Sequence, residues 1–115
     1  MYYDTFCKIY IYSNLDYDSI FNKILMYIKG KKKAIDYITT DWCEACLKRN
    51  KEYSEEYYLA NKEDFIYWNY YLDIEAPENM EIADSFYIER VKDLLTYLKK
   101  FCDGVVASCD FEEFL

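Results

Sequence analysis

Histidine is absent from this sequence of 115 residues. Its absence removes the commonest general base, the usual Cys–His and Ser–His catalytic pairs, and the commonest zinc ligand. Only two glycines and one proline are present, so the chain has little of the backbone freedom that a glycine-rich phosphate loop needs. No serine nucleophile elbow occurs either. The sequence therefore predicts a binding protein rather than an enzyme, with no cofactor.

Basic side chains are scarce, with 14 lysines and arginines against 22 acidic residues and a formal net charge of −8. Such a charge repels phosphates and argues against a nucleic-acid partner, whereas it favours a cationic partner. The one basic run, KGKKK at Lys29 to Lys33, falls where a helix is expected to end. Lysines there complement the terminal carbonyls, so we interpret the run as a helix cap and linker.

Long apolar runs are also missing, so no membrane span and no membrane partner are expected. The first residues, MYYDTFCKIY, lack the basic region and apolar run of a secretory signal. The five cysteines are an odd number, which does not suit a secreted disulfide scaffold. We expect a cytoplasmic protein with reduced thiols.

What the sequence has in abundance is aromatic residues, at 21%, of which 15 are tyrosines. Tyrosine suits half-buried strands and interface anchors, but the same excess is typical of low-GC genomes, so both interpretations stay open. A hydrophobic content of 53% excludes a disordered chain. The length favours one domain over residues 1–115.

Two segments carry the apolar spacing of amphipathic helices. The residues that share a face are Ile20, Ile24 and Ile28 in the first segment, and Ile88, Val91, Leu95, Leu98 and Cys102 in the second. These patterns predict helices near 15–29 and 84–103.

Each predicted helix has a polar residue at its start and a glycine just past its end. Asn14 or Asp16 can cap the first helix, and Asp84 or Ser85 the second. Gly30 and Gly104 are then expected to be left-handed C-terminal caps.

Four other segments have the alternation or the β-branched and aromatic content of strands, and they cover residues 5–13, 34–47, 64–76 and 105–110. The order strand, helix, strand, strand, helix, strand predicts an α+β, ferredoxin-like βαββαβ fold. Its four-stranded antiparallel sheet would carry both helices on one face. The uncovered face would be a docking surface rich in tyrosine: Tyr10, Tyr12, Tyr67 and Tyr71.

The stretch TDWCEACLKRN, residues 40–50, has a Trp before a Cys-x-x-Cys. Cys43 and Cys46 could form a thioredoxin-like redox pair or half of a zinc site, but the proline, glycines and further ligands that these sites use are missing. In a strand, residues three apart point to opposite faces, so the two sulfurs would not converge. We favour this structural interpretation, and expect Trp42 on the uncovered face beside Thr40 and Glu44.

Carboxylates gather in two places. The first group comes just before the second helix and consists of Asp73, Glu75, Glu78, Glu81 and Asp84. The second lies at the C-terminus and consists of Asp110, Glu112 and Glu113. Most such groups are solvated or stabilise a helix start. Presentation of negative charge to a basic protein ranks second, and catalysis by paired carboxylates ranks last.

The segments DFIYWNYYLDIEAPEN and YIERVKDLLTYLKKFCDGVVASCDFEEFL, and more loosely KIYIYSNLDYDSIFNKI, show a long aromatic strand, an amphipathic helix and a last strand ending in Cys-Asp-Phe-Glu. This pattern resembles small acidic immunity proteins of bacterial polymorphic-toxin and contact-dependent inhibition systems. The resemblance implies stoichiometric neutralisation of a cognate toxin domain, often a nuclease.

The residues that we expect to contact such a partner are chosen from the charge and aromatic pattern, and they are Asp73, Glu75, Glu78, Asp110, Glu112, Tyr67 and Tyr71. Two other functions stay open: a thioredoxin-like or metal-binding protein that uses Cys43 and Cys46, and a small-ligand or regulatory domain. The sequence also leaves open whether a homodimer covers the tyrosine-rich face.

Overall fold

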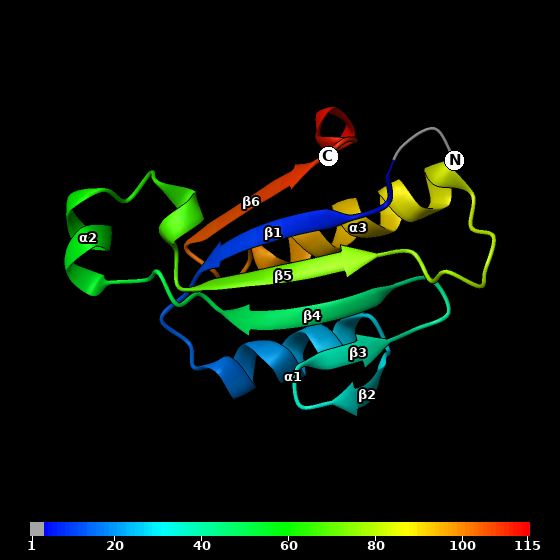
Figure 1. The fold of residues 1–115 in the computed structure, drawn as a ribbon, viewed down its shortest axis with the longest axis horizontal. Coiled ribbons are helices and arrows are strands. Elements are labelled where there is room, and N and C mark those ends of the chain that lie inside the picture. The colour runs from blue at the N-terminus through cyan, green and yellow to red at the C-terminus, as the bar shows by residue number, and fades with distance from the viewer. Residues whose placement is uncertain (1–3) are drawn as a thin grey trace.

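The computed structural model describes residues 4–115 and shows one antiparallel sheet with two long helices behind it (Figure 1). The six strands are β1 (Cys7–Tyr12), β2 (Lys31–Ala34), β3 (Tyr37–Thr39), β4 (Glu44–Arg49), β5 (Tyr70–Glu75) and β6 (Gly104–Cys109), and they lie in the order β2-β3-β4-β5-β1-β6. The helices are α1 (Tyr17–Tyr27), α2 (Glu55–Ala60) and α3 (Asp84–Leu98), with short 3-10 turns η1 (Phe65–Tyr67) and η2 (Glu112–Phe114).

The α+β class and the antiparallel sheet are confirmed, whereas the expected number of four strands is wrong. The two additional strands form the hairpin β2–β3, which extends the sheet beyond β4. The expected placement of both long helices on one face holds for α1 and α3 (Figure 1).

The predicted strand over 34–47 is wrong because a tight turn divides it at Thr40. The Thr40 hydroxyl accepts hydrogen bonds from the backbone N–H of Trp42 at 3.0 Å and of Cys43 at 2.9 Å. The Thr40 N–H also donates to the Cys43 carbonyl at 2.9 Å, which closes the β3–β4 hairpin. Threonine side chains favour such turns because their oxygen satisfies the backbone locally.

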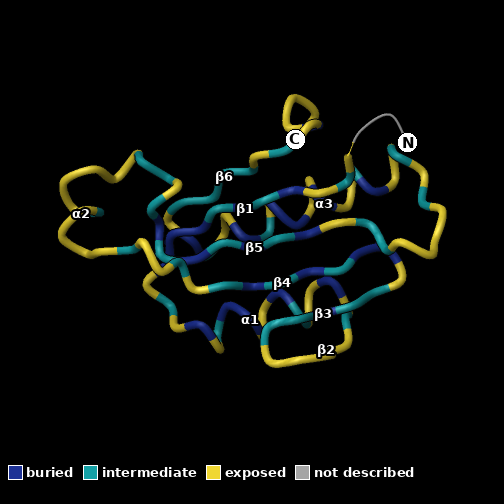
Figure 2. Tube along the Cα trace, viewed as in Figure 1, coloured by how far each residue is buried: buried dark blue, intermediate teal, exposed yellow. Residues whose placement is uncertain are grey.

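The interpretation of the lysine run as a cap and linker is also wrong, because Lys31 to Lys33 belong to strand β2. Strand β2 lies at the edge of the sheet, and all of its residues are exposed (Figure 2). An exposed edge invites pairing with another chain, and lysines oppose it because their charges cannot be buried there.

Helix α1 begins as expected, since the Asp16 carboxylate accepts a hydrogen bond from the Ser19 N–H at 2.8 Å. This contact lowers the pKa of Asp16. Its end differs from the expectation, because the left-handed residue is Lys29, with φ of 55°, and Gly30 has no positive φ. A Cβ on Gly30 would lie 2.3 Å from Ile38 Cγ2, so this glycine permits close packing against β3.

Helix α3 covers most of its predicted range, but its N-cap is Ala83, which makes no side-chain capping bond. Of the two expected caps, Asp84 is therefore the first residue of the helix, and Ser85 lies inside it. Gly104, like Gly30, has no positive φ, so the expected left-handed cap is wrong at both glycines.

The strand predicted over 64–76 begins only at Tyr70, because Phe65–Tyr67 form the turn η1. Tyr67 therefore does not share a strand face with Tyr71. The connection between β4 and β5, which includes α2 and η1, folds over one end of the sheet. There Tyr12 stacks on Tyr58 with ring centroids 3.6 Å apart, so Tyr12 is buried rather than part of an uncovered face.

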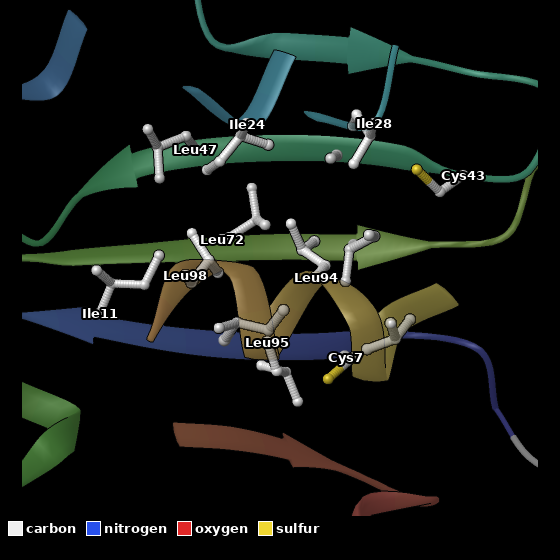
Figure 3. Packing of buried hydrophobic residues seen from close by; sticks show 14 of the residues in the cluster. Cys7, Ile11, Ile24, Ile28, Cys43, Leu47, Leu72, Leu94, Leu95 and Leu98 are labelled. Atoms are coloured by element: carbon white, nitrogen blue, oxygen red, sulfur yellow. The ribbon is translucent and has the colours of Figure 1, made fainter. Parts of the chain in front are cut away.

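The core fills the space between the sheet and the two long helices (Figure 3). Alternate strand residues point into it, as in the Cys7, Ile9 and Ile11 series of β1. Trp42 is only 7% exposed, and its ring makes an edge contact with the ring of Tyr87 of α3, with ring centroids 6.0 Å apart. The expectation that Trp42 lies on the uncovered face is wrong, because the Thr40 turn places it before the strand alternation begins.

Within residues 4–115 the helices are too short or too polar for any of them to cross a bilayer.

Candidate functional site

The face of the sheet that points away from α1 and α3 is called the open face here (Figure 1). Its central strands contribute every second residue, and these are Lys8, Tyr10, Glu44, Cys46, Lys48, Tyr71, Asp73 and Glu75. The burial pattern of β5 confirms the alternation, since Tyr70, Leu72 and Ile74 are buried and Tyr71, Asp73 and Glu75 are not.

Asp73 lies at the centre of this face, opposite Lys8 of β1 and Cys46 of β4. The Lys8 Nζ is 3.8 Å from Asp73 Oδ1, and it also lies 4.3 Å from the Tyr71 ring centroid. Asp73 Oδ1 is shielded from water but accepts no hydrogen bond within the described chain. Burial therefore raises the pKa of Asp73, while the charges of Lys8 and Lys48 oppose the shift.

Lys48 is committed elsewhere, because its Nζ lies 2.5 Å from the Asp36 carboxylate of the β2–β3 turn. This hydrogen bond is the main reason why the pKa of Asp36 is lowered. The charge of Lys48 therefore acts on both Asp36 and Asp73. The ion-pair partner of Asp73 is Lys8, at 3.8 Å.

Glu44 and Glu75 are direct cross-strand partners on β4 and β5. Tyr37 donates a hydrogen bond of 2.7 Å to Glu44 Oε1, but neither carboxylate makes an ion pair within residues 4–115. Burial raises the pKa of Glu75, and the charges of Glu44 and Glu78 add to the shift. Like charges directly opposite in a sheet are destabilising, so this pair costs the isolated protein free energy.

The predicted contact residues fall into a main group and two outliers. Glu78 follows β5 and lines a shallow hollow together with Glu75. Asp110 follows β6, and its Oδ2 accepts a hydrogen bond from the Asp4 N–H at 3.3 Å. Since Asp4 also contributes to the raised pKa of Glu75, the carboxylates of the β5 and β6 ends approach one another at the same end of the sheet.

The two outliers are Tyr67 and Glu112. Tyr67 lies in η1 and packs edge-on against Tyr57 with ring centroids 5.1 Å apart, away from the carboxylates. Glu112 lies in η2, near Cys7 and Cys109. Burial raises the pKa of both of these thiols, and the charge of Glu112 contributes to the shift.

Five members of the open face are absent from the predicted contact set, and they are Lys8, Tyr10, Glu44, Cys46 and Lys48. The sequence does contain the signal for Glu44, because Glu44, Cys46 and Lys48 alternate with the apolar Ala45 and Leu47. Its pairing with Glu75 depends on the register of β4 against β5, which no local pattern specifies.

The two thiols of the Cys-x-x-Cys motif lie on opposite faces of the sheet. Cys43 points into the core and Cys46 lies on the open face, as expected for a strand. Burial raises the pKa of Cys43 to about 12, whereas a redox nucleophile requires a lowered one. In the described chain no three His, Cys, Asp or Glu side chains converge as metal ligands would.

The sequence matches no protein-family model, and the curated proteins and the solved structures give no significant match to it. The geometry of the open face therefore carries the functional argument.

Proposed function

We propose that this chain is a protein-binding module whose open face docks a cationic protein. The observation that carries the proposal is the opposed pair Glu44 and Glu75, which has no basic partner within residues 4–115. A lysine or arginine from a partner would relieve the repulsion that the pair suffers alone. The gain on binding is therefore larger than for a carboxylate that is already neutralised.

Three further features support protein docking. The half-buried ring of Tyr37 lies beside the carboxylate pair, and that of Tyr71 lies further along β5 on the same face, and both can serve as rigid anchors. Asp73 adds a shielded oxygen without a hydrogen-bond donor, and a donor from a partner would satisfy it. The net charge of −8 also accelerates encounter with a cation-rich surface.

The biological role that we propose is that of an immunity protein, in which the partner is a cognate toxin domain and binding is stoichiometric, without turnover. The support is the resemblance of the strand and helix segments described above, together with the acidic open face. A nuclease toxin has a basic groove for its substrate, and that groove would complement the open face.

A finer description of the fold belongs to the same proposal. Four strands lie side by side in the sheet in the order β4-β5-β1-β6. Along the chain, α1 follows β1 and precedes the β2–β3 hairpin, and α3 connects β5 to β6. We propose that they form a ferredoxin-like unit to which the β2–β3 hairpin is added.

The test is a growth assay in which a candidate toxin domain, taken from a neighbouring gene, is expressed with and without this chain. Wild type is expected to restore growth. The variant with both Glu44→Lys and Glu75→Lys should fail, because it presents cations to a cationic partner. Glu89→Lys on α3 is the charge-reversal control and should protect, since Glu89 is exposed on the helix side.

The same variants distinguish docking on the open face from other modes. Binding of purified toxin domain should weaken as salt concentration rises, and the slope should be smaller for the Glu75→Lys variant. Equal protection by the double variant and by wild type would contradict docking on the open face. Absence of protection by wild type would contradict the immunity role.

A further inference from the structure

A concave pocket of about 820 Å³ lies at the end of α1, beside the β2–β3 hairpin. Three parts of the fold enclose it: the residues around the end of α1, the β2–β3 hairpin with its Thr40 turn, and the middle of α3. Its charged lining consists of Lys29, Lys31, Lys33, Arg90, Asp41 and Asp93.

The pocket has the opposite electrostatic character to the rest of the protein. Four of the 14 basic side chains and two of the 22 acidic side chains line it, so it has a surplus of two positive charges in a chain of net charge −8. None of the four cations forms an ion pair within residues 4–115. The Arg90 guanidinium lies over an aromatic ring, with its Cζ 5.1 Å from the Phe86 centroid.

Two ordinary roles of lysine explain part of this charge. Lys29 follows the last turn of α1, where a cation offsets the helix dipole. Lys31 and Lys33 lie on the edge strand β2, where they oppose pairing with another chain. Neither role requires Arg90, which comes from α3 and faces the same hollow.

The backbone at Lys29 ends helix α1. Lys29 is the only non-glycine residue with a positive φ in the described chain, at 55°. This conformation is common at helix C-termini, and here the Gly30 N–H donates to the Leu25 carbonyl at 3.0 Å. Lys29 is one of the residues that line the pocket.

We propose that this pocket binds a small molecule that carries phosphate groups. Ammonium and guanidinium groups are the donors that bind phosphate best, and four residues that carry them line this hollow. The volume lies within the range typical of small-ligand sites. The acidic remainder of the surface repels an extended polyanion, so the ligand is a small molecule rather than a nucleic acid.

This site is independent of the proposed docking of a protein. None of the open-face carboxylates lines the pocket. A Glu75→Lys variant should therefore bind the ligand as wild type does, so failure of one proposal leaves the other standing.

The experiment is calorimetric titration with sodium pyrophosphate at constant ionic strength. We expect 1:1 binding to wild type, weakened about tenfold or more in the variant with Lys31→Gln and Lys33→Gln. The control variant has Lys99→Gln and Lys100→Gln, which removes the same charge from exposed residues outside the pocket and should change the affinity less than twofold. Arg90→Gln tests the same pocket from α3 and should also weaken binding, even if the β2 variant folds poorly.

Three results would overturn the proposal. One is the absence of binding at millimolar pyrophosphate, and another is equal weakening by the control variant, which would indicate a general charge effect. The third is tighter binding of a single-stranded oligonucleotide than of pyrophosphate, which would assign the pocket to nucleic acid.

Discussion

The indole ring of Trp68 lies directly on Gly104, where a Cβ would come within 2.5 Å of Trp68 Cη2. Trp68 is buried, and its Nε1 donates a hydrogen bond of 2.8 Å to the Lys62 carbonyl. This contact ties the long connection that carries α2 and η1 to the start of β6. The glycine is therefore required by packing, not by an unusual backbone conformation.

We predict that Gly104→Ala destabilises the protein by about 1–3 kcal/mol, because the added methyl group overpacks the contact with Trp68. Chemical denaturation followed by circular dichroism measures the free energy of unfolding. A double-mutant cycle with Trp68→Leu is the control, since the smaller side chain leaves room for the methyl group. If Gly104→Ala costs as much in the Trp68→Leu background as in wild type, packing against Trp68 is not the cause.

The elements that the sequence predicts well are those whose signal is local. Helix α1 has an apolar stripe and a side-chain cap at Asp16, and β1 has strict alternation. Both lie where expected, within a few residues at their ends. Packing then only reinforces what the local pattern specifies.

The errors occur where contacts distant in sequence decide. Lys31–Ala34 is a strand only because it pairs with β3, and its composition gives no such indication. Gly30 resembles a left-handed cap, yet contact with Ile38 is its reason, and Lys29 takes the left-handed conformation instead. A pattern along the sequence cannot show contacts between residues that lie far apart in it.

The same limit applies to the candidate site. The alternation of β5 places Tyr71, Asp73 and Glu75 on one face without any tertiary knowledge. The alternation pattern puts Trp42 on the wrong face, because the Thr40 turn interrupts the alternation just before β4. The Glu44–Glu75 pair depends on strand register and appears only in the folded chain.

The carboxylate pair makes stability depend on pH. Because burial and neighbouring carboxylates raise the pKa of Glu75, the folded protein binds its proton more tightly than the unfolded chain does. Protonation of Glu75 therefore contributes stability that is complete below its ordinary pKa and is lost as pH rises through the raised value.

We predict that Glu75→Gln has little effect on the melting temperature near pH 4 but raises it at pH 7, because it removes the charge that lies opposite Glu44. Differential scanning calorimetry at the two pH values measures the effect. The control is Glu89→Gln, an exposed helix position without an opposed carboxylate partner in the sheet. A Glu75→Gln variant no more stable than wild type at pH 7 would show that the repulsion is already screened.

The five cysteines give a last prediction, because burial raises the pKa of every one of their thiols. The pKa of Cys102 rises to about 11, and Cys7, Cys43 and Cys102 are buried. At pH 7.5 only a small fraction of each thiol is the reactive thiolate, so alkylation of the native protein should be slow.

We expect iodoacetamide to label the half-buried Cys46 and Cys109 first, and the other three only as fast as the protein opens. Peptide mass spectrometry over a time course identifies the order, and a denatured sample, in which all five react together, is the control. A Cys46→Ser variant should lose the open-face label alone. Rapid labelling of Cys43 in the native protein would show that the Thr40 turn exposes its thiol and would reopen the redox interpretation of the motif.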